Sequence, residues 1–416
     1  MLGVTAIAVN GMIGAGIFAL PATVAALIGV SSPLAYIVAG FATLLITLCF
    51  AECGSRFDAS GGPYLFVKGA FGRFAGFQAG WMFAFTRVTA VAAISNTFAS
   101  YLGYFVPAAA RGFGRAFTVT LLLGALAAIN CLGIRQGMWA INLLTVGKVV
   151  PLLVFCAVGL FFLAPGSFSF TNLPAPVPMQ QACLLLFFAF GGFEAATTLN
   201  EEVIRPRRTV PLALMLGVTS VVILYLFIQV VAMGTLPDLV KSATPLASAA
   251  ARFLGTGGAL LLTAGALFST TGTNSTSILA GSRMLYALAR GGELPRGLGR
   301  LHPAYRTPVV GTLVFVAVAW GLAISGTFVQ LAVVSALSRV LLYAATCLSV
   351  PMLRRTMPVS SDTFKLPGGA AIPFVAAALC AWMMIGSTLY AVAMLTGAVA
   401  LGGLLHAFAR ATSARS

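Results

Sequence analysis

The stretch Asn10-Gly-Met-Ile-Gly-Ala-Gly-Ile-Phe-Ala-Leu-Pro21 lies inside an uncharged apolar segment that runs from Leu2 to about Val30. A helix needs about 20 apolar residues to cross a bilayer, and this segment has enough of them. Each glycine costs a helix about 1 kcal/mol relative to alanine. The glycines at 11, 14 and 16 therefore predict a helix that stops and restarts at mid-membrane depth.

Such a break exposes amides at the start of the second half-helix and carbonyls at the end of the first. Unpaired backbone at that depth is tolerated only where it is buried in protein or lines a cavity. A zwitterionic solute would satisfy both ends, with its carboxylate on the amides and its amine on the carbonyls. The alternative is that Gly11, Ala15 and Gly16 let a neighbouring helix pack closely. This stretch alone leaves both readings open.

Composition places the chain among polytopic membrane proteins. Of its 416 residues 60% are hydrophobic and 8% are charged, whereas soluble domains carry about 25% charged residues. The net charge of +16 includes no basic run interleaved with aromatic residues, which argues against a nucleic-acid partner. The seven cysteines form no C-x-x-C pattern and the chain has two histidines, so we expect no metal site and no cofactor.

Apolar runs predict an all-α protein with about twelve transmembrane helices. They lie near residues 2–29, 33–55, 73–106, 116–134, 138–164, 180–204, 209–236, 255–289, 307–326, 328–353, 371–386 and 389–409. The last division is the weakest, because Gly386-Ser387 is a poor helix breaker.

The distribution of Lys and Arg predicts the orientation. If the N-terminus is cytoplasmic, the inside loops hold Arg56, Lys68, Arg73, Arg135, Arg205, Arg207, Arg208, Arg290, Arg296, Arg300, Arg306, Arg354, Arg355, Lys365, Arg410 and Arg415. The outside loops then keep only Arg111, Arg115, Lys241 and Arg252. By the positive-inside rule we expect a multi-pass protein of the cell inner (plasma) membrane with both termini in the cytoplasm.

The sixth span repeats the anomaly of the first. Phe187-Phe-Ala-Phe-Gly-Gly-Phe-Glu194 places two glycines in the middle of an apolar run, followed by a carboxylate. Two glycine-interrupted spans in corresponding positions indicate a transporter with inverted repeats, which favours the substrate site over simple close packing. The expected units within one transport domain, 1–416, are residues 1–164 for spans one to five, 180–353 for spans six to ten, and 371–409 for the last two.

Several stretches appear in an order that resembles the bacterial amino acid permeases of the amino acid–polyamine–organocation (APC) family. They are Gly11-Met-Ile-Gly-Ala-Gly-Ile-Phe18, Glu52, Gly61-Gly-Pro-Tyr64, Ala70-Phe-Gly72, Phe187 to Glu194, Glu201 to Pro211, Gly281 to Pro295, His302, Arg306-Thr-Pro308 and Leu353-Arg-Arg355. Each is weak alone, but together they cover nearly the whole chain. The resemblance implies a leucine-transporter-like 5+5 inverted repeat with broken helices 1 and 6, and amino acids or related amines as substrates.

Carried over residue by residue, the resemblance puts the substrate carboxylate on the backbone amides of Ala15 and Gly16, with Gly14 allowing the close approach. The substrate amine would lie against carbonyls from both breaks, those of Met12, Phe188 and Gly191. The two half-helix ends supply the matching partial charges.

Further pocket or gate candidates follow from the same resemblance. Phe190 or Phe193 would resemble the family's aromatic lid, although core packing explains either one as well in a chain with 31 Phe. On the eighth span, Thr273, Asn274 and Thr276 would face the same region; their alternative role is interhelical hydrogen bonding by small polar residues.

Lys148 is a basic side chain at membrane depth, about 20 Å along a helix beyond Arg135 at about 1.5 Å per residue. A lysine that deep costs about 3 kcal/mol or more, which marks it as a functional candidate. The resemblance implies a substitute for a bound sodium ion, with the ammonium touching carbonyls of the broken first helix and the eighth helix. Burial disfavours a charged amine, so Lys148 is either a proton-coupling group or a fixed cation that ties helices together.

Other charged residues complete the candidates. Glu194, which follows the second break, can pair with a cation or titrate, and is the second coupling candidate. Arg87 and Arg339 fall within spans and need buried partners; their role stays open. Four acidic residues sit at expected cytoplasmic helix ends and are predicted to form gate-like ion pairs with nearby arginines: Glu52, Asp58, Glu201 and Glu202.

Two classes of function fit a polytopic membrane protein of this kind. An enzyme needs a converging nucleophile, base or metal set, and the sequence offers none. A sensor usually adds a soluble domain to the membrane part. The sequence contains no nucleotide-binding motif, which argues against ATP-driven transport. We therefore expect secondary transport of amino acids, driven by protons or by exchange. The apolar residues around the breaks favour a neutral amino acid, while Glu194 keeps a cationic amino acid or polyamine open.

Overall fold

A computed structural model describes residues 2–57, 61–133, 138–164, 174–194, 206–357, 364–366 and 368–413. Every regular element within these ranges is a helix. The α-helices are α1 Leu2–Met12, α2 Ala15–Ile28, α3 Ser32–Ser55, α4 Pro63–Phe71, α5 Arg73–Leu102, α6 Gly112–Cys131, α7 Met138–Gly159, α8 Pro176–Phe190, α9 Pro206–Thr235, α10 Pro245–Arg290, α11 Val309–Ser325, α12 Phe328–Thr356, α13 Ala371–Ile385 and α14 Leu389–Ser413.

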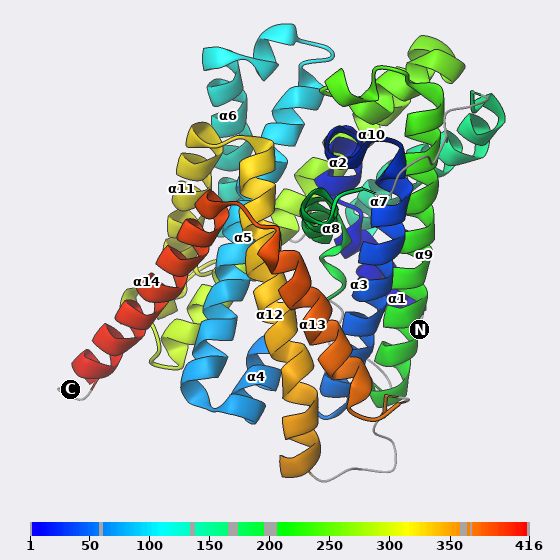
Figure 1. The fold of residues 1–416 in the computed structure, drawn as a ribbon. Coiled ribbons are helices and arrows are strands. Elements are labelled where there is room, and N and C mark those ends of the chain that lie inside the picture. Colours follow the sequence, from blue (N-terminus) through cyan, green and yellow to red (C-terminus); the bar gives the residue numbers. More distant parts are fainter. Residues whose placement is uncertain are drawn as a thin grey trace.

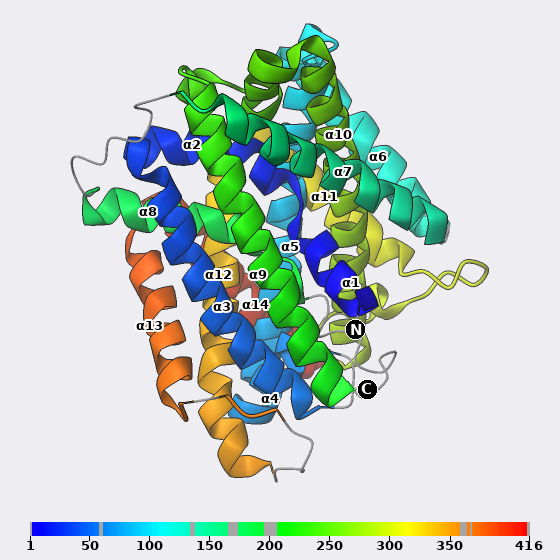
Figure 2. The same cartoon turned by 90° about the vertical axis from the view of Figure 1, so that its right-hand side faces the viewer.

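The helices form a single bundle (Figure 1), and α8 is seen end-on there but lengthwise after a quarter turn (Figure 2). Six described segments are long and apolar enough to cross a membrane: Ala15–Ser55, which joins α2 to α3, Gly112–Cys131, Thr209–Thr235, Pro245–Arg290, Phe328–Thr356 and Leu389–Arg410. Shorter apolar helices accompany them, including α8, α11 and α13. The chain is a multi-pass helical membrane protein; the count of twelve spans and the division into two repeats stay predictions.

The first expected span, 2–29, consists of two helices in the structure. α1 ends at Met12 and α2 begins at Ala15. Between them Gly14 is extended, with φ −124° and ψ −155°, and it has no side chain with which to cap α2. The first amides of α2 therefore have no acceptor within their own helix.

The second interruption comes at the end of α8. This helix ends at Phe190, and Gly192 has φ +120°, a conformation that residues with a Cβ rarely adopt. A short turn leads to Glu194, which is buried. The rest of the expected sixth span, residues 195–204, lies outside the described residues.

The two interruptions touch each other. A Cβ built on Gly11 would lie 2.6 Å from the carbonyl oxygen of Gly192, which is far inside contact distance. Further along the chain, a Cβ on Gly16 would lie 2.7 Å from the Cα of Ala189, a backbone atom of α8. The glycines at 11 and 16 thus allow the broken segments to approach backbone to backbone, as small residues do between membrane helices.

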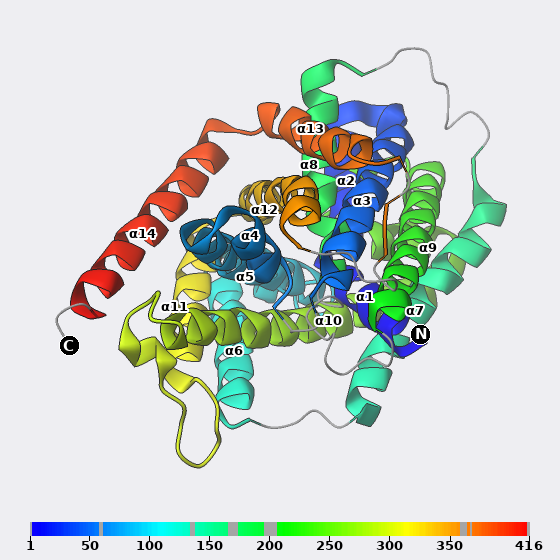
Figure 3. The ribbon, with the colours of Figure 1, turned by 90° about the horizontal axis from the view of Figure 1, so that it is seen from below.

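The expected eighth span starts earlier than hydropathy suggested. α10 begins at Pro245 instead of near 255, and it bends at Gly255, where φ is +64°. A glycine accepts this conformation without a Cβ clash, so the helix continues on both sides of the bend. Packing of α10 against α5, and of α5 against α12, builds the centre of the bundle. In contrast, α13 and α14 lie along its outside (Figure 3).

Candidate functional site

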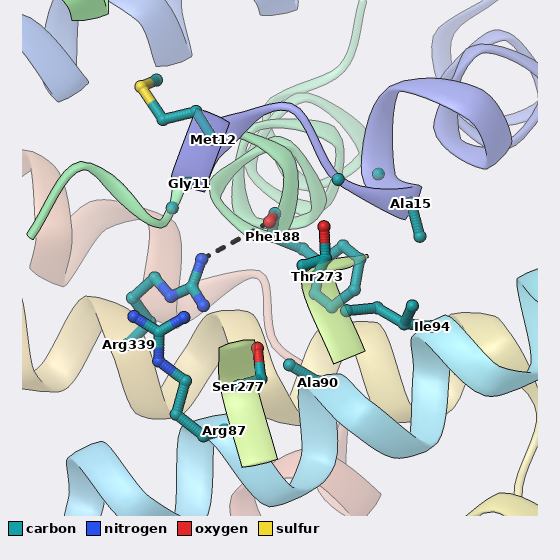
Figure 4. Close-up of a pocket in the computed structure, with 13 residues that line it drawn as sticks. Gly11, Met12, Ala15, Arg87, Ala90, Ile94, Phe188, Thr273, Ser277 and Arg339 are labelled. Atoms are coloured by element: carbon teal, nitrogen blue, oxygen red, sulfur yellow. Dashed lines mark hydrogen bonds between the residues drawn. The ribbon is translucent and has the colours of Figure 1, made fainter. Parts of the chain in front are cut away.

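A buried pocket lies where the two interruptions meet, and Figure 4 shows its walls. The interrupted segments form one side, and α5, α10 and α12 form the other. Its lining residues are Gly11, Met12, Gly14, Ala15, Gly16, Arg87, Ala90, Ile94, Phe188, Gly191, Thr273, Ser277 and Arg339. All six residues predicted to bind substrate are therefore on the pocket wall, together with Thr273.

The start of α2 is the anion-attracting part of this wall. The first turn of a helix presents free N–H groups and a partial positive charge, here at Ala15 and Gly16. Thr273 from α10 stands next to it: a Cβ on Gly14 would lie 3.3 Å from Thr273 Cγ2. The hydroxyl of Thr273 is buried, and no group in the described ranges hydrogen-bonds to it. Amides and hydroxyl together can bind a carboxylate.

The carbonyls expected to receive a substrate amine already accept hydrogen bonds from the protein. The Tyr225 hydroxyl donates to the Met12 carbonyl at 2.9 Å. Arg339 Nη1 lies 3.4 Å from the Phe188 carbonyl, the contact drawn as a dashed line in Figure 4. The same guanidinium lies against Gly191, where any Cβ would overlap it. In this structure, protein donors therefore occupy part of the expected amine site.

Two arginines line the pocket opposite the start of α2. Arg87 comes from α5 and Arg339 from α12, and their guanidinium groups are drawn together in Figure 4. Both side chains are buried, with 9% and 4% of the residue exposed. The Nε atoms of both are buried and have no hydrogen-bond partner among the described residues. A buried guanidinium that keeps unused donors is able to bind a further acceptor.

Glu194 holds the arginine side of the pocket together. Its Oε1 accepts from Arg87 Nη2 at 3.0 Å. Its Oε2 accepts from the Tyr343 hydroxyl and from the Gly192 amide, each at 2.8 Å. The carboxylate thereby joins α5, α12 and the second interruption. Of the two roles left open for Glu194, the structure shows pairing with a cation.

Lys148 lies behind the first interruption and does not line the pocket. Its ammonium donates to the carbonyls of Asn10 at 2.6 Å and Ile13 at 2.8 Å. The Ser269 hydroxyl of α10 donates to the same Ile13 carbonyl at 3.2 Å. Lys148 itself thus bonds to the broken first helix, while α10 reaches the same carbonyl through Ser269. A cation is favoured there because the C-terminal end of a helix carries partial negative charge.

The remaining predicted residues lie away from the pocket wall. Phe190 stacks on Tyr225 with ring centroids 5.4 Å apart, and Phe193 packs on Phe50 at 5.3 Å. Both phenyl groups are fully buried, which fits core packing. Asn274 Nδ2 donates to Ser95 Oγ at 3.2 Å, an interhelical hydrogen bond. Thr276 is exposed and bonds to its own helix.

Ion pairs occur at one end of the bundle, as expected for Glu52. Its carboxylate accepts from Arg56 at 2.8 Å and from Arg354 at 2.7 and 2.6 Å. A second pair joins Arg73 to Glu293 at 3.4 Å. The other three acidic candidates, Asp58, Glu201 and Glu202, lie outside the described residues.

Sequence reasoning missed several pocket residues. Arg87 and Arg339 had been recognised only as costly charges within spans, and Ala90, Ile94 and Ser277 had not been singled out. The signal available was the presence of two arginines in apolar helices, which in membranes are rare and usually face the interior. Among the described residues, no three His, Cys, Asp or Glu side chains come together to hold a metal ion.

Two interrupted helices that enclose a buried pocket within a helical membrane bundle define a solute transporter. The chain belongs to the amino acid permease family, whose sequence model matches residues 1–404. It is therefore a permease and not an enzyme.

Relatives of this chain carry different solutes. It is 27% identical to the methylthioribose transporter of Bacillus subtilis over 402 residues, 91% of this chain and 86% of that protein. It is 26% identical to the branched-chain amino acid permease BcaP of the same organism over 411 residues, 92% and 86% of the two chains. An uncharacterized transporter of Mycobacterium tuberculosis is 34% identical over 332 residues, 78% and 72% of the two chains.

Proposed function

We propose that this protein is a secondary transporter that moves amino acids across the cell inner membrane, with its substrate site at the meeting point of the two interruptions. The observation that carries the proposal is the uncapped start of α2, which lines a buried pocket beside the Thr273 hydroxyl, a group without a hydrogen-bond partner among the described residues. A substrate carboxylate on the amides of Ala15 and Gly16 would satisfy donors that the described protein groups leave unpaired.

Proton coupling through Lys148 is the second part of the proposal. Its ammonium is 4% exposed and bonds only to the two carbonyls of the first interruption within the described residues. Loss of its proton would weaken the contact that ties α7 to α1, and so would link protonation to movement of the substrate site. Exchange of one solute for another remains the alternative, with Lys148 as a fixed cation.

A proteoliposome uptake panel tests the proposal. Purified full-length protein is reconstituted, and uptake of radiolabelled neutral, acidic and basic amino acids is measured with and without an imposed pH gradient. Each condition is repeated with and without internal substrate. We expect uptake of at least one amino acid that accumulates in response to outside acid. Uptake that strictly requires internal substrate would assign exchange, and no amino acid uptake under any condition would contradict the proposal.

A further inference from the structure

We propose that the solute carries two carboxylates, one bound at the start of α2 and the other by Arg339 beside Arg87. This inference rests on the proposed substrate site and refines it, replacing the expected neutral amino acid by a short acidic solute. Acidic amino acids and simple dicarboxylic acids share the required chemistry. The argument comes from the charges, the unused donors and the arrangement of the pocket wall.

The charges around the pocket do not balance. Among the described residues, two guanidinium groups, those of Arg87 and Arg339, face one carboxylate, that of Glu194, which leaves one positive charge. Glu194 forms its salt bridge with Arg87, and no described carboxylate forms one with Arg339. Glu194 also interacts electrostatically with Arg339, so the two guanidinium groups share one carboxylate. Excess buried positive charge is unfavourable, and an arginine cannot discharge itself by losing a proton. An anionic group on the solute would supply the missing charge.

Arg339 also has unused hydrogen-bond donors. A guanidinium offers five N–H donors, yet among the described residues Arg339 makes two long hydrogen bonds from Nη1, each 3.4 Å, to the carbonyls of Phe187 and Phe188. Its Nε is buried without a partner among the described residues. A carboxylate binds a guanidinium through two parallel hydrogen bonds, which are shorter and stronger than these. The pocket face of Arg339 is therefore suited to a carboxylate.

The two anion-binding groups lie on different parts of the wall. Figure 4 places the start of α2, marked by Ala15, on one side of the pocket with Thr273 of α10 beside it, and Arg339 with Ser277 on the other. The first carboxylate of a short solute on the α2 amides would leave its second pointing toward Arg339. Basic solutes are excluded, because their side chain would bring a cation against the two guanidinium groups.

Uptake and competition measurements with full-length protein in proteoliposomes test this inference. The probes are radiolabelled glutamate, aspartate, succinate and glutarate, compared with leucine, glutamine and arginine. We expect saturable uptake of acidic probes and no competition by arginine. Glutamate and aspartate without succinate and glutarate would assign acidic amino acids, and the reverse would assign dicarboxylic acids. The second result would support two-carboxylate binding while contradicting amino acid transport.

Variants of Arg339 separate recognition from folding. Arg339→Gln should lower uptake of the acidic probe about tenfold or more while glutamine uptake is kept or gained. Arg339→Lys, which keeps the charge but not the planar fork, should give an intermediate loss. Arg283→Gln removes an exposed arginine of α10 outside the pocket and is the matched control. Unfolding temperatures in detergent identify any variant that fails to fold.

Three results would overturn the inference. Wild-type protein that takes up leucine but none of the acidic probes would leave amino acid transport intact and remove the second carboxylate. Equal loss of acidic and neutral uptake in Arg339→Lys, with normal unfolding temperature, would assign Arg339 to holding the Phe187 and Phe188 carbonyls. Unchanged acidic uptake in Arg339→Gln would place any second carboxylate elsewhere.

Discussion

The Lys148 side chain ends on two backbone carbonyls at the C-terminal end of a half-helix. Within the described residues it forms no salt bridge, so its charge is balanced by peptide dipoles alone. Such a contact differs from an ion pair because it weakens when one proton leaves, without stranding a buried carboxylate. In the proposed coupling, protonation at this single residue would therefore be linked to the position of the first interruption.

Replacing Lys148 should remove pH-driven transport. We expect Lys148→Ala to lose accumulation driven by outside acid, because it removes the exchangeable proton and both hydrogen bonds. Ser269→Ala is the matched control: it removes another donor to the Ile13 carbonyl but no exchangeable charge, so it should keep pH-driven accumulation. Accumulation is measured in proteoliposomes with an imposed pH gradient. Undiminished accumulation by Lys148→Ala would assign proton coupling to another group, and Glu194 is the next candidate.

At the residue scale, the sequence predicted the backbone breaks but left the direction of the Arg339 side chain open. Gly14 and Gly191 mark breaks because glycine's helix cost is local and readable in any helix. Arg339 was different: whether a side chain in a spanning helix faces lipid or a pocket depends on how that helix is rotated against its neighbours. The position of its guanidinium over Gly191 results from the packing of α12 on α8, which no local pattern contains.

At the scale of elements, Gly14 and Gly16 at the start of α2 face different helices and differ in their tolerance of a side chain. A Cβ on Gly16 would meet backbone and side-chain atoms of Ala189 at 2.7 Å. A Cβ on Gly14 would meet only the side chain of Thr273, at 3.3 Å. The first neighbour cannot move without shifting a helix, whereas the second can adjust its rotamer. Gly16 therefore has two roles: it lines the pocket, and it allows α2 to pack closely on α8, which was the alternative explanation of the glycine pattern.

Matched alanine substitutions should separate the two roles. Gly16→Ala should lower the free energy of unfolding by about 1–3 kcal/mol, because it forces α2 away from α8. Gly14→Ala should leave stability nearly unchanged and weaken substrate binding, since the added methyl group points at Thr273 beside the α2 amides. Unfolding temperature in detergent and equilibrium substrate binding report the two effects. Equal stability of both variants would contradict the packing assignment for Gly16.

Helix boundaries were predicted correctly where a local residue interrupts an apolar run and incorrectly where none does. The expected starts near 33, 73 and 328 agree with α3, α5 and α12, where Pro, Gly and Thr interrupt apolar runs. The start of α10 was misplaced because its first turns, from Pro245 to Gly255, are less apolar than a spanning helix. Their alanines and the proline at the first turn favour a helix, but the bend at Gly255 hides their continuity with the rest of α10.

The orientation of the whole molecule is tested by chemical labelling. The excess of Lys and Arg in one set of loops predicts that Thr209, near the start of α9, lies at the cytoplasmic end. Six native cysteines are buried and Cys131 is partly exposed, so Cys131→Ser provides a clean background. In intact cells, a membrane-impermeant thiol reagent should leave Thr209→Cys unlabelled until the cells are opened. Labelling from outside in intact cells would reverse the predicted topology.

The backbone contact between Gly11 and Gly192 has a mechanical consequence for the whole bundle. At this contact, backbone meets backbone, and neither Gly11 nor Gly192 places a side chain between the two interrupted segments. A tilt of α1 relative to the end of α8 would pivot about this contact. Such a motion would widen the space between the two segments on one side of the contact and narrow it on the other, so that a passage would not open at both ends at once.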